Sequence, residues 1–263
     1  MTAEKNINHM QQEPFIQKIP SVPDAFKAIL RADLTVQWRN RRAMIMSIIV
    51  PIIFLISWKS LIPEIGPGGV ISICVAIGLP AIGLMGYSAT LARDRERGIF
   101  QRLRATPIPT WIIMTSRIVV QLLVMALMTL VTCAVACFVD GIEFSFLSVV
   151  LIVIAAVIGG LSFLALGQFI AAIMKSSDAV NAAARLIYFP IAIAGALGEI
   201  GLFGTLVQKI VFWSPLGTTK TMLAAAYAPS TINGDVLLAV LVTLGYGVVF
   251  AAIGIRRFAW SVN

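Results

Sequence analysis

Six long stretches that are almost free of charged residues occupy most of this sequence. They cover roughly residues 43–58, 70–91, 111–139, 146–174, 182–199 and 236–255. About 20 consecutive apolar residues cross the hydrocarbon core of a bilayer as a helix. The chain is 59% hydrophobic and only 12% charged, whereas soluble domains average about 25% charged residues. The sequence therefore predicts an all-α polytopic membrane protein with six transmembrane helices.

Residues 1–42 precede the first span as a polar tail that ends in an amphipathic helix. Ser21 and Asp24 are typical of a helix start. The apolar residues after them fall on one stripe: Val22, Phe26, Ile29, Leu30 and Leu34. We expect this helix to lie in the membrane interface, and a solvated polar helix is the alternative. Residues 43–263 then form the six-span domain.

The stretch 200–230, between the fifth and sixth spans, is apolar only in pieces. It is broken by Gly201, Gly204, Pro215 and Gly217. Helices that enter a membrane without crossing it tolerate such breaks where protein covers their backbone. We expect short re-entrant or interfacial helices before the last span.

The basic residues indicate the orientation of the chain. Lys and Arg concentrate in the N-terminal tail, between the second and third spans, between the fourth and fifth, and after the sixth, whereas Lys59, Lys209 and Lys220 fall on the other side. Cytoplasmic segments carry the excess of Lys and Arg. The protein is therefore predicted to lie in the cell membrane with both termini on the cytoplasmic side. Because the basic residues are accounted for by this orientation, the net charge of +8 does not indicate nucleic-acid binding, and we expect none.

The spans lack the groups that would supply energy or chemistry. Ion-driven carriers place carboxylates or histidines at mid-membrane, but the only histidine, His9, lies in the polar tail. No G-x-x-x-x-G-K-[ST] phosphate loop occurs, and no metal-ligand cluster or catalytic pairing is recognisable. We therefore expect no enzyme activity, metal or cofactor in this chain. A transporter with this sequence would need an external energy source.

The densest group of charges is the segment 93–109, RDRERGIFQRLRATPIP, between the second and third spans; we call it the charged segment. Its pattern predicts a helix that bends at Gly98 and ends at Pro107, with Phe100 and Leu103 apolar among the charges. Apolar anchors surrounded by charges suit docking into another protein. A positively charged cytoplasmic loop with interfacial residues is the alternative.

Within the charged segment, ERGIFQRLRATP fits the pattern E-x-G-x-x-x-x-L-x-x-[ST]-P. It resembles the cytoplasmic coupling segment of type-2 ATP-binding-cassette (ABC) exporter permeases of the drug- and antibiotic-exporter kind, although Ile99 stands where that family commonly has Thr. Two later motifs, LIYFPIAIAGALG and FWSPLGTTKTMLAAAY, resemble the family's fifth span and the segment before its last span. Ala194 replaces the usual Ser in the first of these. The three motifs follow the family's order.

The resemblance implies a dimer of six-helix permeases, most simply a homodimer. Each protomer is expected to bind a cytosolic ATPase subunit, which carries the ATP and Mg. The implied ATPase-coupling residues are Arg93, Asp94, Arg95, Glu96, Arg97, Gly98, Phe100, Arg102, Leu103, Arg104, Thr106 and Pro107. The substrate path would lie between the protomers. Its candidate lining residues are Met85, Tyr87, Tyr188, Phe189 and Pro215, although packing explains each of them equally well.

The first functional hypothesis is the membrane subunit of an ABC exporter that moves amphipathic small molecules, such as drugs, antibiotics or lipids, outward. The second is the permease of a polysaccharide or teichoic-acid exporter, which also has six spans and separate ATPases. A channel that is not driven by ATP, or an intramembrane enzyme, is the hypothesis of another class. The absence of catalytic groups counts against the enzyme.

Overall fold

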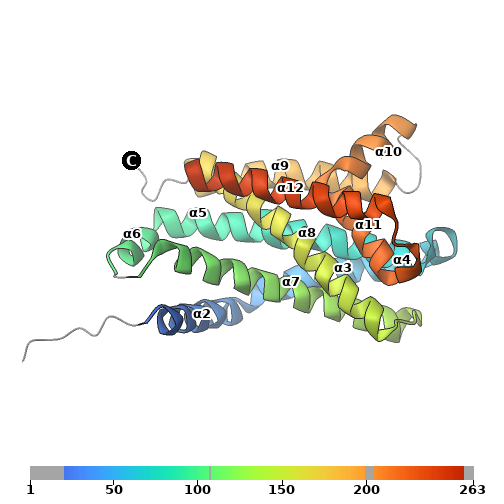
Figure 1. Ribbon diagram of the computed structural model, residues 1–263, viewed down its shortest axis with the longest axis horizontal. Coiled ribbons are helices and arrows are strands. Elements are labelled where there is room, and N and C mark those ends of the chain that lie inside the picture. The colour runs from blue at the N-terminus through green and yellow to red at the C-terminus, as the bar shows by residue number, and fades with distance from the viewer. Residues whose placement is uncertain (1–20, 107, 199–203, 258–263) are drawn as a thin grey trace, which may run out of the picture.

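The protein is an elongated bundle of helices (Figure 1). The computed structural model describes residues 21–106, 108–198 and 204–257, and no strand occurs among them. The long elements are α3 (Arg41–Ser57), α4 (Ile62–Pro80), which continues through the π-helical segment η2 (Ala81–Tyr87) into α5 (Ser88–Glu96), α7 (Thr110–Asp140), α8 (Phe146–Ile173), α9 (Ser177–Gly198) and α12 (Gly234–Arg257). The short elements are α2 (Val22–Arg39), η1 (Lys59–Leu61), α6 (Ile99–Arg104), α10 (Gly204–Trp213), α11 (Pro215–Tyr227) and η3 (Pro229–Thr231).

Five of the six predicted spans coincide with helices that could cross a membrane, and the first, in α3, does so only if α3 is counted together with α2. Five helices in the described ranges are long and apolar enough to cross a membrane, and there are up to six if α2 and α3, bent by 61°, count as one span. The second span runs from Lys59 to Glu96 and the fifth begins at Ser177, so both are longer than predicted. Apolar runs mark only the part of a helix that lies in lipid, and a helix continues beyond it. Glu199, the predicted end of the fifth span, lies outside the described residues.

The second span forms the centre of the bundle. Every residue from Val70 to Pro80 is buried. Small residues let neighbouring helices approach it closely: a Cβ atom on Gly167 of α8 would lie 2.2 Å from the carbonyl oxygen of Gly83. Pro80 has no N–H to donate, and the π-helical segment follows it directly. The span is thus kinked at Gly66, where φ is +74°, and it is helical from there to Glu96 with a π-helical irregularity after Pro80.

The short helix α11 enters the bundle, as the breaks in the stretch 200–230 predict. Ser214 caps its first turn by accepting from the Gly217 N–H at 3.1 Å, and Leu216 is fully buried. The hydroxyl of Thr243 on α12 donates to that of Thr218 on α11 at 2.8 Å. Protein therefore covers the backbone of α11, which is the condition for a helix that does not cross the membrane.

The connections sort onto two ends of the bundle (Figure 1). The turn between α5 and α6, the link between α8 and α9 and the last turn of α12 lie at one end, which we call the α6 end. The turn between α3 and α4, the link between α7 and α8, and helices α10 and α11 lie at the other. At that second end Lys59 pairs with Asp140 at 3.3 Å. The alternation is that of a chain crossing six times.

Helix α2 lies against α7 at the α6 end. Ser21 caps it by accepting from the Asp24 N–H at 3.4 Å, as predicted. Asp33 accepts a hydrogen bond from the Ser116 hydroxyl of α7 at 2.6 Å. Three of the five residues of the predicted apolar stripe are half-buried: Phe26, Ile29 and Leu30. The other two, Val22 and Leu34, are exposed, as are Val36 and Trp38 near the end of the helix, which an interfacial helix requires.

Candidate functional site

The charged segment consists of the end of α5, a turn and α6. Gly98 has a φ of +67°, a left-handed conformation that a side chain with Cβ adopts only at a cost. Helix α5 therefore ends before Gly98 and α6 begins at Ile99 in a new direction, which confirms the predicted bend. Pro107, the predicted stop, lies outside the described residues, and Pro109 directly precedes α7.

Arg95 turns inward and caps a neighbouring span. Its side chain is almost fully buried, with 4% of the residue exposed. The guanidinium donates to the carbonyl oxygens of Ala171, Met174 and Lys175 at 2.6, 2.5 and 3.2 Å. These carbonyls end α8, where helices leave acceptors without a partner of their own. Arg95 thus ties the charged segment to the fourth span.

Glu96 makes the matching connection to α9. Its carboxylate accepts from the backbone N–H of Ser177 at 2.6 Å and from the Ser177 hydroxyl at 2.7 Å. The first N–H groups of a helix lack intrahelical acceptors, and a carboxylate is favoured beside them. Adjacent residues of one segment therefore cap the end of α8 and the start of α9.

A third contact joins the charged segment to α7. Asp94 pairs with Arg117, and about one-seventh of each side chain is exposed (15% and 14%). The guanidinium carbon of Arg117 lies 4.9 Å from the centre of the Phe100 ring, and Phe100 is fully buried. A cation over an aromatic face is favourable, more so when water is excluded. Asp94 of α5 and Phe100 of α6 thereby hold the charged segment against the third span.

The remaining predicted coupling residues divide by exposure. Arg93, Arg97, Arg102 and Thr106 are exposed, and Leu103 is half-buried; the side chain of Arg104 is outside the described set. The charged segment therefore has an inner side, engaged with α7, α8 and α9, and an outer side available to another molecule.

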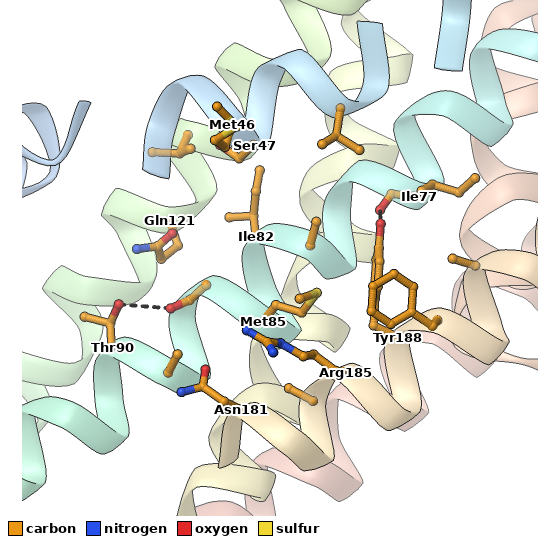
Figure 2. A pocket seen from close by; sticks show the side chains of 18 of the residues that line it. Met46, Ser47, Ile77, Ile82, Met85, Thr90, Gln121, Asn181, Arg185 and Tyr188 are labelled. Carbon is orange, nitrogen blue, oxygen red and sulfur yellow. Dashed lines mark hydrogen bonds between the residues drawn. The ribbon is translucent and has the colours of Figure 1, made fainter. Parts of the chain in front are cut away.

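A partly open cavity of about 590 Å³ begins beside the charged segment. Residues of α2, α3, the second span, α7 and α9 line it. Three predicted path residues are among them: Met85, Tyr188 and Phe189. Figure 2 shows the guanidinium of Arg185 extending from α9 toward Met85, with Asn181 one turn before it. We call this cavity the pocket.

The pocket is polar at one end and apolar at the other. Gln37, Asn40, Thr90, Arg93, Gln121, Asn181 and Arg185 supply the polar groups, and they come from the α6 ends of their helices or from the α2–α3 junction. Phe54, Ile77, Ala192 and Ile193 line the far end. A cavity of this volume and composition matches the size and mixed lining of small-molecule sites.

Two predicted path residues lie elsewhere. Tyr87 is on the second span but buried, with 2% exposed, and it is not among the pocket's lining. Pro215 opens α11 at the opposite end of the bundle. Residues two positions apart on a helix face different neighbours. Tyr87 therefore lies outside the cavity although it is only two residues from Met85.

Sequence reasoning missed Arg185 and Asn181 as pocket residues. Their spacing with Tyr188 and Phe189 is that of one helix face, and all four line the pocket. That stripe was a usable signal. The partners of Arg95 and Glu96, which lie 76–81 residues away, left no such signal.

The sequence matches the family described as ABC-2 type transporter over residues 24–217. This match extends from α2 into α11 and includes both the charged segment and the pocket. No curated protein matches the chain.

Proposed function

Because this chain belongs to the ABC-2 type transporter family and is the membrane subunit of an ABC transporter, we propose that it forms the outward path of an exporter for amphipathic small molecules. A separate cytosolic ATPase, with its ATP and Mg, would supply the energy. Two copies of the chain would form the path, with both termini in the cytoplasm.

The attachment of the charged segment to several spans carries this proposal. The segment continues the second span and holds the ends of α8 and α9 through Arg95 and Glu96. The second span and α9 also line the pocket. A displacement of α6 by a partner would therefore reach the pocket walls directly, through a connected set of hydrogen bonds.

The outer side of the charged segment supports an ATPase contact. Arg97 and Arg102 are exposed there, beside the half-buried Leu103. A partly exposed apolar anchor between charges gives affinity and register to a docking surface. Phe100 is unsuited to direct contact because it is fully buried; it would act by holding α6.

The test is co-purification with the cytosolic ABC ATPase subunit of the transporter. We expect the wild-type permease to retain the ATPase, and the variants Leu103→Glu and Arg102→Glu to lose most of it. Arg256→Glu, at the exposed end of α12, is the matched control and should retain it. Equal retention by all variants would refute the docking assignment.

The subunit count is tested on the same preparation. The mass of the purified complex should correspond to two permease chains and two ATPase subunits. A complex with one permease chain would contradict a path between protomers.

A further inference from the structure

Two arginines, Arg93 and Arg185, line the pocket, and none of the described residues that line it is Asp or Glu. We infer that its occupant is an anionic amphiphile: an apolar chain whose carboxylate, phosphate or sulfate head binds these arginines. This inference rests on the proposed export function and names the class of substrate.

The position of Arg185 in its span is the first step. It follows the start of α9 at Ser177 by eight positions, so it lies about 12 Å along the helix axis at 1.5 Å per residue. A charged side chain within a span is costly and usually faces a cavity or a partner. Arg185 faces the pocket, on the same stripe as Asn181 and Tyr188.

Three of the nearby acidic residues are engaged elsewhere, and a fourth, Asp178, is exposed at the start of α9 and forms no salt bridge within the described residues. Asp94 pairs with Arg117, Glu96 caps Ser177, and Asp33 accepts from Ser116. No salt bridge within the described residues involves Arg93 or Arg185. Arg93 Nε donates to the Ala89 carbonyl of its own helix at 3.1 Å. Two positive charges thus remain at the pocket, and no carboxylate of the described residues pairs with either of them.

The lining also matches the two halves of an amphiphile. Guanidinium groups bind carboxylate and phosphate through paired N–H donors, and Gln121 and Asn181 add neutral donors nearby. The apolar chain would extend toward Phe54 and Ile193 at the far end. The head would therefore lie at the α6 end and the tail would point away from it.

The same charges select against cationic compounds. A cationic head group and the pocket arginines repel each other more strongly in a partly water-excluded cavity than in bulk water. Repulsion of the wrong ligand gives a binding site specificity. Neutral chains would lose the contribution of the arginines but meet no repulsion. The expected order of affinity is anionic, then neutral, then cationic.

The experiment measures binding to the permease alone, without the ATPase, in nanodiscs of phosphatidylcholine. The probe is the fluorescent fatty acid parinarate, with empty nanodiscs as the blank. The competitors share one chain length and differ in the charge of the head group: dodecanoate is anionic, dodecanol is neutral and dodecyltrimethylammonium is cationic. We expect dodecanoate to displace the probe best. Arg185→Gln should weaken it about tenfold, which corresponds to about 1.4 kcal/mol for the loss of a charged contact.

Two variants control for folding and for surface charge. Arg185→Lys keeps the positive charge and should retain the preference for the anion. Arg256→Gln removes an exposed arginine outside the pocket and should bind like the wild type. Equal displacement by all three competitors, or no effect of Arg185→Gln, would overturn the inference while leaving ATPase retention and export intact. No binding of any chain would overturn the proposed substrate path as well.

The source of the anion is distinguished by the lipid. Nanodiscs of phosphatidylglycerol that compete with parinarate would identify a bilayer lipid as the occupant. Undiminished parinarate binding in phosphatidylglycerol would identify a free amphiphile. Both results support an anionic head in the pocket.

Discussion

Four arginines near the α6 end differ in what surrounds them. Arg95 and Arg117 are held by groups of the protein: carbonyls at the end of α8 for one, and Asp94 with the Phe100 ring for the other. Arg93 and Arg185 line the pocket, and neither has an acidic partner among the described residues.

The difference shows that one residue type serves two purposes within a short distance. A buried guanidinium whose terminal N–H groups are bound to protein acceptors stabilises the fold, and its loss leaves those acceptors without partners. A guanidinium in an open cavity costs the fold little and attracts an anion. Removing Arg95 or Arg117 should therefore affect stability, whereas removing Arg93 or Arg185 should affect binding.

The largest effect on stability is expected for Arg95→Met. The variant loses three hydrogen bonds from a charged donor, which should cost about 3 kcal/mol of unfolding free energy or more. The melting temperature of the purified permease reports the change. Arg97→Met, at an exposed neighbouring position, is the control and should melt like the wild type. Similar melting temperatures of both variants would show that Arg95 does not stabilise the fold.

A smaller loss is expected for Asp94→Asn, since Arg117 keeps its contact with the Phe100 ring. The pair is mostly buried, so its loss should cost about 2 kcal/mol. A double-mutant cycle with Arg117→Gln measures the interaction itself. Additive effects of the two single variants would show that the pair contributes nothing as a pair.

Glu96→Gln should lower the melting temperature only slightly, because the carboxylate is exposed to water. Its effect should be local: faster hydrogen exchange of the amides in the first turn of α9, beginning at Ser177. Ser177→Ala removes one of the two hydrogen bonds and should give an intermediate rate. Unchanged exchange in both variants would rule out the cap as a link between the charged segment and α9.

The smallest effect on stability is expected for Arg185→Gln. Exposed residues without partners usually change stability by less than about 0.5 kcal/mol, so the melting temperature should stay near that of the wild type. The same variant should show the greatest loss of anion binding. A fall in melting temperature comparable to that of Arg95→Met would place Arg185 in the first group, as a structural residue.

Much of the fold could be predicted from the sequence because its signals are local. Apolar runs gave the spans, and the breaks around Pro215 gave the short helices before the last span. Gly98 gave the bend of the charged segment because only a residue without Cβ readily adopts a positive φ. The helix cap at Ser21 could be predicted in the same way, because a capping side chain binds the backbone of the helical turn that directly follows it.

The candidate site could be predicted only in part. The charged segment stood out by its charge density, but Arg93, Arg95 and Arg97 are equivalent in sequence. Their different environments arise because a helix turns 100° per residue, so that Arg95 meets the end of α8 while Arg93 meets the pocket. Tyr87 shows the same effect in reverse, since it is two residues from Met85 and lies outside the cavity.

The sequence by itself determined that the chain crosses a membrane, how its segments alternate between two sides, and that it carries a charged segment next to the second span. Each of these follows from hydrophobicity and backbone preference over a few consecutive residues. Only the tertiary structure decided which charges are neutralised by the protein and which remain for a ligand. Those pairings join residues such as Arg95 and Met174, 79 positions apart, and they exist only after the helices have packed.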